Sequence, residues 1–223
     1  MAKTDPPHLL SRRTLLLALP FGLAGCARGP DISFALPDFA IGDYGPGYDN
    51  GYPLAAVDPM RVNSTYRRQA VAYGGSQRPG TIIVDPAHHF LYLVEDDGRA
   101  LRYGVGVGRE GFAWSGTATV RRKQVWPTWT PPAEMQRRQP ESAQYADGMP
   151  GGPANPLGAR ALYLYQGNRD TMYRIHGTND PGSIGRSMSS GCIRLLNQDI
   201  IDLYNRVHIG TKVVVLGGDQ GVA

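Results

Sequence analysis

Two residues of this chain have the chemistry for nucleophilic catalysis. Cys192 follows two serines and a glycine, and His176 lies 16 residues before it, at the end of a run typical of a β-strand. A cysteine attacks as its thiolate, so it needs a base or a positive environment that lowers its pKa from about 8.5. A histidine and a cysteine on neighbouring segments are the minimum for acyl transfer.

Backbone amides beside the cysteine could complete such a site. The run Ser190-Gly191-Cys192 offers consecutive N–H groups for a developing oxyanion, and Gly191 leaves room for a substrate carbonyl to approach the main chain. Taken singly, Cys192 could instead be a small buried side chain and His176 a hydrogen-bonded core residue. Their combination with amide donors favours the catalytic interpretation.

Metal binding is the other common use of cysteine and histidine. One cysteine together with His88, His89, His176 and His208, dispersed along the chain, lacks the compact spacing of a zinc site. The glycine-rich stretch Gly104–Gly108 is followed by neither a helix start nor a Lys-Ser/Thr pair, so it is not a phosphate loop. Because a thiolate and backbone amides suffice for acyl transfer, no cofactor or metal is expected.

The N-terminal segment has the pattern of an export signal. Arg12 and Arg13 precede an apolar run, Leu15 to Leu23, and small residues then lead to Cys26. A run of about nine apolar residues is too short for a membrane-spanning helix, which needs about 20. Residues 1–25 are therefore predicted to be a signal peptide.

The end of this segment predicts a lipid anchor. Leu23-Ala24-Gly25-Cys26 resembles the bacterial lipobox, whose cysteine is lipidated before cleavage, and Ser11 to Leu16 resembles a twin-arginine signal. A lipidated Cys26 cannot pair with Cys192, and a lone thiol in an oxidising compartment is a liability unless it is used. Ala27 favours sorting to the outer membrane if the bacterium has two membranes. An ordinary signal cleaved elsewhere is the alternative.

The charge of the chain does not indicate a nucleic-acid partner. The formal net charge is +4, but three basic residues and one acidic residue lie in the first 25 positions, so the remainder carries +2. No basic patch with interleaved aromatic residues is present in the sequence.

We expect a flexible tether over residues 26–66 and one folded domain over residues 67–223. From Gly29 to Tyr66 the chain is rich in Gly, Pro, Asp and Tyr and has no sustained helical or strand period. The rest predicts a mainly β domain with a minor helical component. Strands are predicted at 81–85, 89–94, 100–108, 116–123, 161–165, 171–176 and 211–216, and a helix at 197–207 with Asn197 as N-cap and Asp199 in its first turn.

A long Pro-rich segment, Val125 to Gly158, separates two of these strands and carries Trp126 and Trp129. A stretch of this length inside a domain is usually a lid or a binding loop. Because exposed tryptophans are costly without a partner, we expect the segment to lie over the site and both tryptophans to contact substrate. A solvated insertion is the alternative.

These motifs resemble the L,D-transpeptidase (YkuD-type) family of bacterial cell-wall enzymes. The resemblance is carried by His176-Gly177-Thr178, by the run Ser189 to Leu195, by Asn197-Gln198-Asp199 and by Asn155-Pro156-Leu157-Gly158. It covers roughly residues 78 to 217. It implies a mainly β sandwich or barrel with one or two short helices and a long Pro-rich loop over the site.

The resemblance implies a peptidoglycan transpeptidase. Cys192 would attack the carbonyl between the third residue of a stem peptide and the D-Ala at position four, D-Ala would leave, and an amine would take the acyl group to give a 3→3 crosslink. His176 would act as base and then acid, with the backbone carbonyl of Gly177 orienting its ring. The amides of Gly191 and Cys192, together with that of Ser190, would bind the oxyanion.

Other expected substrate contacts are Arg194, which could pair with a stem-peptide carboxylate, and Ser189, Thr178, Trp126 and Trp129. Many family members have His where this chain has Ser190, so the contribution of that histidine to substrate placement is missing here. A surface arginine on the approach to the helix is the alternative for Arg194.

Several functions share the same first step. Water as acceptor would make the protein an L,D-carboxypeptidase, and a lysine of an envelope protein would attach that protein to the wall. From a different class, the domain could be a lipid-tethered peptidoglycan-binding module, against which the intact pair His176 and Cys192 argues. A papain-like hydrolase would have its cysteine well before its histidine. The expected location is the periplasm or cell envelope.

Overall fold

The computed structural model describes residues 1, 44–109, 114–189 and 191–217. The chain divides into two compact units, residues 1–35 and 36–223. Met1 is the only residue of the first unit that is described, so the predicted signal peptide and the predicted lipidation site Cys26 lie outside the described residues, as does Ser190.

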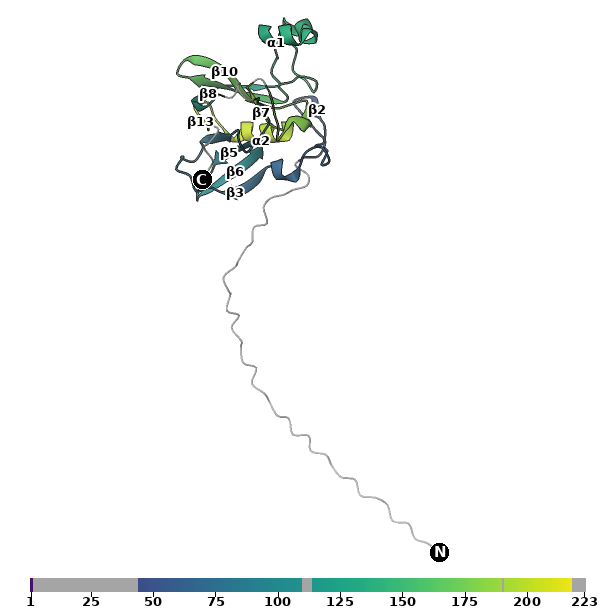
Figure 1. Ribbon diagram of the computed structural model, residues 1–223. Coiled ribbons are helices and arrows are strands. Elements are labelled where there is room, and N and C mark those ends of the chain that lie inside the picture. Colours follow the sequence, from purple (N-terminus) through teal and green to yellow (C-terminus); the bar gives the residue numbers. More distant parts are fainter. Residues whose placement is uncertain (2–43, 110–113, 190, 218–223) are drawn as a thin grey trace. The chain divides into compact units, whose positions relative to one another are not determined.

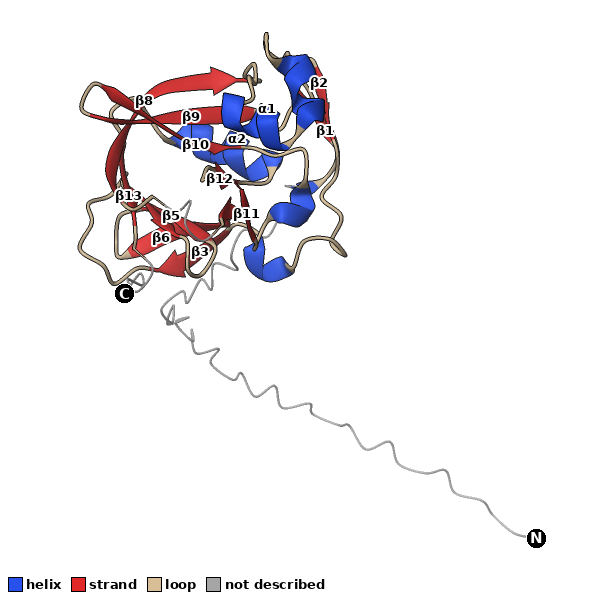
Figure 2. Ribbon diagram, turned by 45° about the horizontal axis from the view of Figure 1, so that its top comes forward, coloured by secondary structure: helices blue, strands red, loops and turns tan. Residues whose placement is uncertain are grey.

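A nine-stranded mixed sheet forms the main part of the second unit (Figure 1). The strand order is β12-β10-β9-β8-β13-β4-β5-β6-β3, and all neighbours are antiparallel except the parallel pairs β10–β12 and β13–β4. Figure 2 shows the sheet curving from β8, β9 and β10 past β13 to β5, β6 and β3. The strands of the sheet are β3 (Gln69–Ala72), β4 (Ile82–Asp85), β5 (Phe90–Val94), β6 (Arg99–Gly104), β8 (Gly116–Val125), β9 (Arg160–Gln166), β10 (Arg169–His176), β12 (Ile193–Arg194) and β13 (Lys212–Val215).

Smaller elements complete the described part of the chain. They are the two-stranded pairs β1 (Gly47–Asp49) with β2 (Tyr52–Leu54) and β7 (Val107–Gly108) with β11 (Ser187–Ser189), the helices α1 (Ala133–Arg138) and α2 (Asn197–Arg206), and the 3-10 turns η2 (Ser64–Tyr66), η3 (Pro140–Tyr145) and η4 (Pro181–Ser183). The predicted mainly β fold with one or two short helices is confirmed.

The main core joins the sheet to α2. All four residues of β4 are buried, because this strand lies inside the sheet and both of its faces are covered. Ile200 and Leu203 of α2 are fully buried in the same apolar cluster as Leu162 and Leu164 of β9. Runs of β-branched and aliphatic residues predicted these strands correctly, because the fold buries one or both faces of each strand.

Helix α2 begins one position earlier than the predicted cap implies. Leu196, not Asn197, is the N-cap, so the assignment of Asn197 as N-cap was wrong. The side-chain oxygen of Asn197 instead accepts a hydrogen bond from the backbone N–H of Ala159 (2.9 Å), at the end of the Pro-rich segment. Asp199 lies in the first turn, as predicted, and accepts a hydrogen bond from the hydroxyl of Tyr44 (2.7 Å).

Residues 44–66 do not form a tether, which corrects the expected boundary at residue 67. We call them the N-terminal strap. Val57 and Val62 are buried in a small cluster with Ile184 and Leu196, and the β1–β2 hairpin places Asp49 against the sheet. The strap is therefore held by an apolar cluster and by polar contacts with distant parts of the chain. The rest of the predicted tether, up to residue 43, lies outside the described residues.

The Pro-rich segment is partly regular, since it contains α1 and η3. Figure 1 shows α1 at the far end of the molecule from β3, beyond the strands β8 and β10. Among the described residues, no helix has the length and apolar character to cross a membrane.

Candidate active site

The two predicted catalytic residues come from neighbouring strands. Strand β10 pairs in parallel with β12, with Ile175 opposite Ile193 and His176 opposite Arg194. His176 is the last residue of β10, and Cys192 directly precedes β12. The backbone N–H of Leu195 donates to the carbonyl of His176 (2.8 Å), which closes the pairing at this end.

His176 is fixed in orientation and neutral at physiological pH. Its side chain is buried, and Nδ1 donates to the backbone carbonyl of Gly177 (2.6 Å), so Nε2 of the neutral ring keeps its lone pair. Burial lowers the pKa of His176 to about 4, and the positive charge of Arg194 adds to this effect. The ring can therefore act as a base, and its contact with the Gly177 carbonyl is the one the family resemblance implies.

Cys192 is half-buried, and its sulfur lies 4.0 Å from the backbone carbonyl oxygen of Met172, to which the thiol can donate. Burial raises the pKa of Cys192, while the backbone of Arg174 and the charges of Arg174 and Arg194 act in the opposite direction. The resting site therefore holds a neutral thiol and a neutral imidazole. Proton transfer from sulfur must then accompany attack on a substrate.

Asn197 joins three segments around His176, a role that its assignment as a helix cap missed. A Cβ on Gly177 would lie 2.3 Å from the Asn197 side-chain oxygen, and a Cβ on Gly158, whose φ is +61°, would lie 2.2 Å from it. Only glycine fits at these two positions, because any side chain would overlap the amide. The end of the Pro-rich segment, the loop after His176 and the start of α2 are therefore packed closely together.

Of the three predicted oxyanion donors, the structure describes Gly191 and Cys192 but not Ser190. Gly191 is buried and has a φ of +120°, a conformation that side chains rarely adopt. It lines a small cavity of about 10 Å³ together with Trp114 and Tyr173, whose rings stack with centroids 5.5 Å apart. This aromatic pair beside the cysteine segment was not singled out from the sequence, because its two members are 59 positions apart.

Arg194 and Ser189 lie on either side of Cys192 along the chain. Arg194 is half-buried, and burial lowers its pKa, with the charges of Cys192 and Asp180 opposing that change. Ser189 ends β11, where it pairs with Gly108 of β7. The charge of Arg194 therefore acts on the Cys192 sulfur, and a contact between Arg194 and substrate stays a prediction.

Thr178 is buried, and its hydroxyl oxygen accepts a hydrogen bond from the backbone N–H of Asp180 (3.0 Å). The residue therefore shapes the turn that follows His176. A contact between Thr178 and substrate stays a prediction.

The two tryptophans do not form an exposed pair. Trp126 is buried, with its indole N–H donating to the carboxylate of Asp49 (2.8 Å) and its ring 4.7 Å from that of Tyr52. The N-terminal strap thus covers Trp126, and the expected contact of each tryptophan with substrate stays a prediction. Trp129 is half-buried, pairs through its backbone with Met149 and lies 6.1 Å from the ring of Tyr145.

In the ranges that the structure describes, no group of three His, Cys, Asp or Glu side chains could bind a metal ion. The polar groups near Cys192 and His176 include backbone carbonyls, the guanidinium groups of Arg174 and Arg194, and the phenol of Tyr173.

Comparison with known proteins agrees with these features. The family model described as YkuD, L,D-transpeptidase catalytic domain, matches residues 79–215. Two curated Escherichia coli K12 proteins, the probable L,D-transpeptidases ErfK/SrfK and YbiS, are 37% and 34% identical over 63% and 60% of this chain. The aligned regions span 44% and 43% of those proteins, so the chain matches less than half of their length.

Two solved structures match the chain with TM-scores below 0.5. One from Brucella melitensis, titled a probable carnitine operon oxidoreductase, is 49% identical over 71% of this chain and 99% of its own, with a TM-score of 0.49. An L,D-transpeptidase from Mycobacterium smegmatis is 17% identical over 68% of each chain, with a TM-score of 0.47.

With TM-scores below 0.5, these structures add nothing to an assignment that rests on the family model and on the curated relatives. The matched range contains His176, Gly177, Gly191, Cys192 and Arg194. The chain belongs to the YkuD family of L,D-transpeptidase catalytic domains.

Proposed function

We propose that this protein is a peptidoglycan L,D-transpeptidase with Cys192 as nucleophile. The observation that carries the proposal is the placement of a neutral, oriented His176 at the end of β10, on the strand that neighbours the cysteine segment. A neutral imidazole at the end of the strand that neighbours a cysteine segment is an arrangement from which nucleophilic acyl transfer can proceed.

In the first half-reaction, sulfur attacks the carbonyl that joins the third residue of a stem tetrapeptide to D-Ala. The thiol proton passes to Nε2 of His176, and the backbone amides of Gly191 and Cys192 stabilise the oxyanion. Collapse breaks the amide bond, the imidazolium returns the proton to the leaving nitrogen, and D-Ala departs. Sulfur then holds the acyl group as a thioester.

In the second half-reaction, the amine of another stem peptide attacks the thioester. His176 removes a proton from the attacking amine, and the sulfur leaves as the thiol after it takes that proton back. The product is a 3→3 crosslink. Water or a lysine of an envelope protein would complete the same reaction as carboxypeptidase or protein attachment, so the acceptor decides between the three activities.

The experiment uses the full-length chain with Cys26→Ser, which is not lipidated and has Cys192 as its single cysteine. We would incubate it with a diaminopimelate-containing disaccharide tetrapeptide and follow the products by mass spectrometry. A dimer that lacks one D-Ala supports transpeptidation, and a tripeptide alone supports hydrolysis. The additional change Cys192→Ala should abolish both products. Substrate binding without turnover by the Cys26→Ser chain would instead support a wall-binding module.

Arg194 is proposed to bind a carboxylate of the donor stem. Arg194→Gln should raise the donor KM at least tenfold, because a charge-assisted hydrogen bond contributes about 1.5–3 kcal/mol. Arg186→Gln is the matched control, since Arg186 is exposed and precedes β11. An unchanged KM and kcat in Arg194→Gln would contradict the substrate role.

We also propose that the protein is exported and anchored at Cys26 in the cell envelope. Labelled palmitate should be incorporated by the wild type and not by Cys26→Ser. Incorporation that is equal in the two would contradict the anchor.

A further inference from the structure

Strand β10 carries a bulge close to Cys192. Asp170 pairs with Tyr165 of β9 and Arg174 pairs with Tyr163, so four steps along β10 correspond to two steps along β9. Met172, in the middle of the bulge, has a φ of +64°. Residues other than glycine and asparagine rarely adopt this left-handed conformation, so other contacts must hold it.

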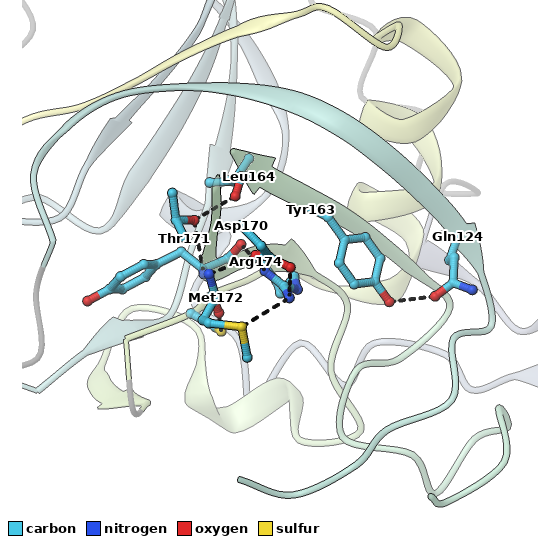
Figure 3. A network of polar contacts seen from close by, with 9 residues as sticks. Gln124, Tyr163, Leu164, Asp170, Thr171, Met172 and Arg174 are labelled. Atoms are coloured by element: carbon cyan, nitrogen blue, oxygen red, sulfur yellow. Dashed lines mark hydrogen bonds and ion pairs between the residues drawn. The ribbon is translucent and has the colours of Figure 1, made fainter. Parts of the chain in front are cut away.

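Hydrogen bonds between two side chains and the backbone shape the bulge (Figure 3). The Asp170 carboxylate accepts from the backbone N–H of Met172 (2.8 Å). The hydroxyl of Thr171 donates to the carbonyl of Leu164 on β9 (2.6 Å) and accepts from the N–H of Tyr173 (3.2 Å). Asp170 and Thr171 thus bind the backbone on both sides of the bulge.

Arg174 closes the bulge from its other end. Its two terminal nitrogens donate to the two carboxylate oxygens of Asp170, at 2.7 and 2.9 Å, and its guanidinium carbon lies 4.5 Å from the centre of the Tyr163 ring. Burial alone would raise the pKa of Asp170, but the hydrogen bonds from Arg174 and Met172 lower it. Figure 3 shows Asp170 and Arg174 facing each other across the bulge.

The inner side of this bulge contacts the nucleophile. The carbonyl of Met172 lies 4.0 Å from the Cys192 sulfur, and the backbone of Arg174 hydrogen-bonds the same sulfur in a way that favours the thiolate. The other influences on the sulfur are the charges of Arg174 and Arg194, which also favour the thiolate, and the neighbouring phenol of Tyr173. The backbone geometry of residues 172–174 therefore sets both the position and the hydrogen bonding of the sulfur.

We propose that Asp170 and Arg174 are positioning residues for the nucleophile, because their two-pronged ion pair fixes the bulge whose backbone holds the Cys192 sulfur. Neither side chain needs to touch substrate for this role. The inference rests on the proposed function in one respect only, which is that Cys192 is the nucleophile.

The test measures the reactivity of Cys192 in the full-length Cys26→Ser chain, where it is the only thiol. We would record the rate of alkylation by iodoacetamide across pH. Asp170→Ala removes the ion pair and the acceptor for Met172, so we expect the thiol pKa to rise by about one unit and alkylation near pH 7 to slow about tenfold. Asp170→Asn keeps an acceptor for the Met172 N–H and should recover part of the rate.

Glu134→Ala is the matched control. It breaks an ion pair of the same i,i+4 spacing, with Arg138 at 3.6 Å in α1, outside the site, and should leave the alkylation profile unchanged. Arg174→Lys keeps the positive charge but loses the two-pronged contact, and should resemble Asp170→Ala. Circular dichroism and thermal unfolding establish that each variant is folded. If Asp170→Ala does not fold, the alkylation profiles of Asp170→Asn and Arg174→Lys test the proposal in its place.

Two results would overturn the proposal. One is a wild-type alkylation profile in the folded Asp170 and Arg174 variants. The other is a lower thiol pKa in Asp170→Asn, because it would mean that Arg174 acts through a charge that Asp170 neutralises, and not through position. Alkylation needs no stem peptide, so failure of the transpeptidase assay leaves this test intact.

Discussion

Burial of His176 makes the stability of the fold depend on pH in a defined window. Its pKa is about 4 in the folded chain, against an ordinary value of 6.5, because the charged ring would lie in a buried site. The unfolded chain therefore binds a proton on His176 near pH 6.5, and the folded chain does so only near pH 4. The stabilisation is fully present above pH 6.5 and is lost as the pH falls toward 4. A difference of this size corresponds to about 3 kcal/mol.

Urea unfolding, followed by tryptophan fluorescence between about pH 7 and pH 4, measures this loss. The reference is His176→Gln, which has no titratable ring but keeps every carboxylate of the wild type. By pH 4 the wild type should have lost about 3 kcal/mol more of its unfolding free energy than the variant. Any difference between the two proteins at pH 7 reflects packing and is subtracted.

Parallel loss of stability in the two proteins would refute the reasoning, because it would mean that His176 titrates alike in the folded and unfolded chains. The same pKa should appear in catalysis. If His176 is the base, the acid limb of kcat/KM for the free enzyme should lie near pH 4, well below the ordinary range of histidine.

Three further substitutions test how the site is supported. Asp49→Ala should lower the unfolding free energy by about 3 kcal/mol in urea, because it leaves the buried Arg160 guanidinium without its carboxylate. Gly158→Ala should lower Tm by about 5 °C or more, since its Cβ would lie 2.5 Å from a backbone nitrogen. Gly167→Ala, with a similar φ of +57° but nothing within 4 Å, is its control and should have a clearly smaller effect. Tyr44→Phe should cost about 1–3 kcal/mol in urea, because a buried carboxylate of α2 loses a hydrogen-bond donor. An unchanged unfolding free energy in Asp49→Ala or Tyr44→Phe, or equal effects of the two glycine changes, would contradict these expectations.

The strands and the cysteine–histidine pair were accessible to sequence reasoning because their signals are local. Runs such as residues 81–85 and 161–165 contain mainly β-branched, aliphatic and aromatic residues, and β4 and β9 lie there. The spacing from His176 to Cys192 predicted a shared site, and the β10–β12 pairing places His176 on the strand next to the one that Cys192 directly precedes. Their chemical roles stay predictions.

The misassigned features depend on partners far along the chain. The strap was taken for a tether because its composition is poor in apolar residues, but Asp49 bonds to Arg160, 111 positions away. Asn197 looks like a helix cap by local preference, yet its side chain binds a backbone amide 38 positions earlier. The β10 bulge has no local signal either, since an Asp and an Arg four residues apart more often indicate a helix.

The N-terminal strap also limits how far the folded unit can lie from the membrane surface. If Cys26 carries the proposed lipid, only the 18 residue steps from Cys26 to Tyr44 separate the membrane surface from the first described residue of the folded unit. Fully extended, they span at most roughly 60 Å, whereas a tether ending at residue 66 would span roughly 140 Å. Distance from the membrane would then restrict which layers of the wall the proposed transpeptidase could serve, whatever the affinity of its proposed active site for substrate.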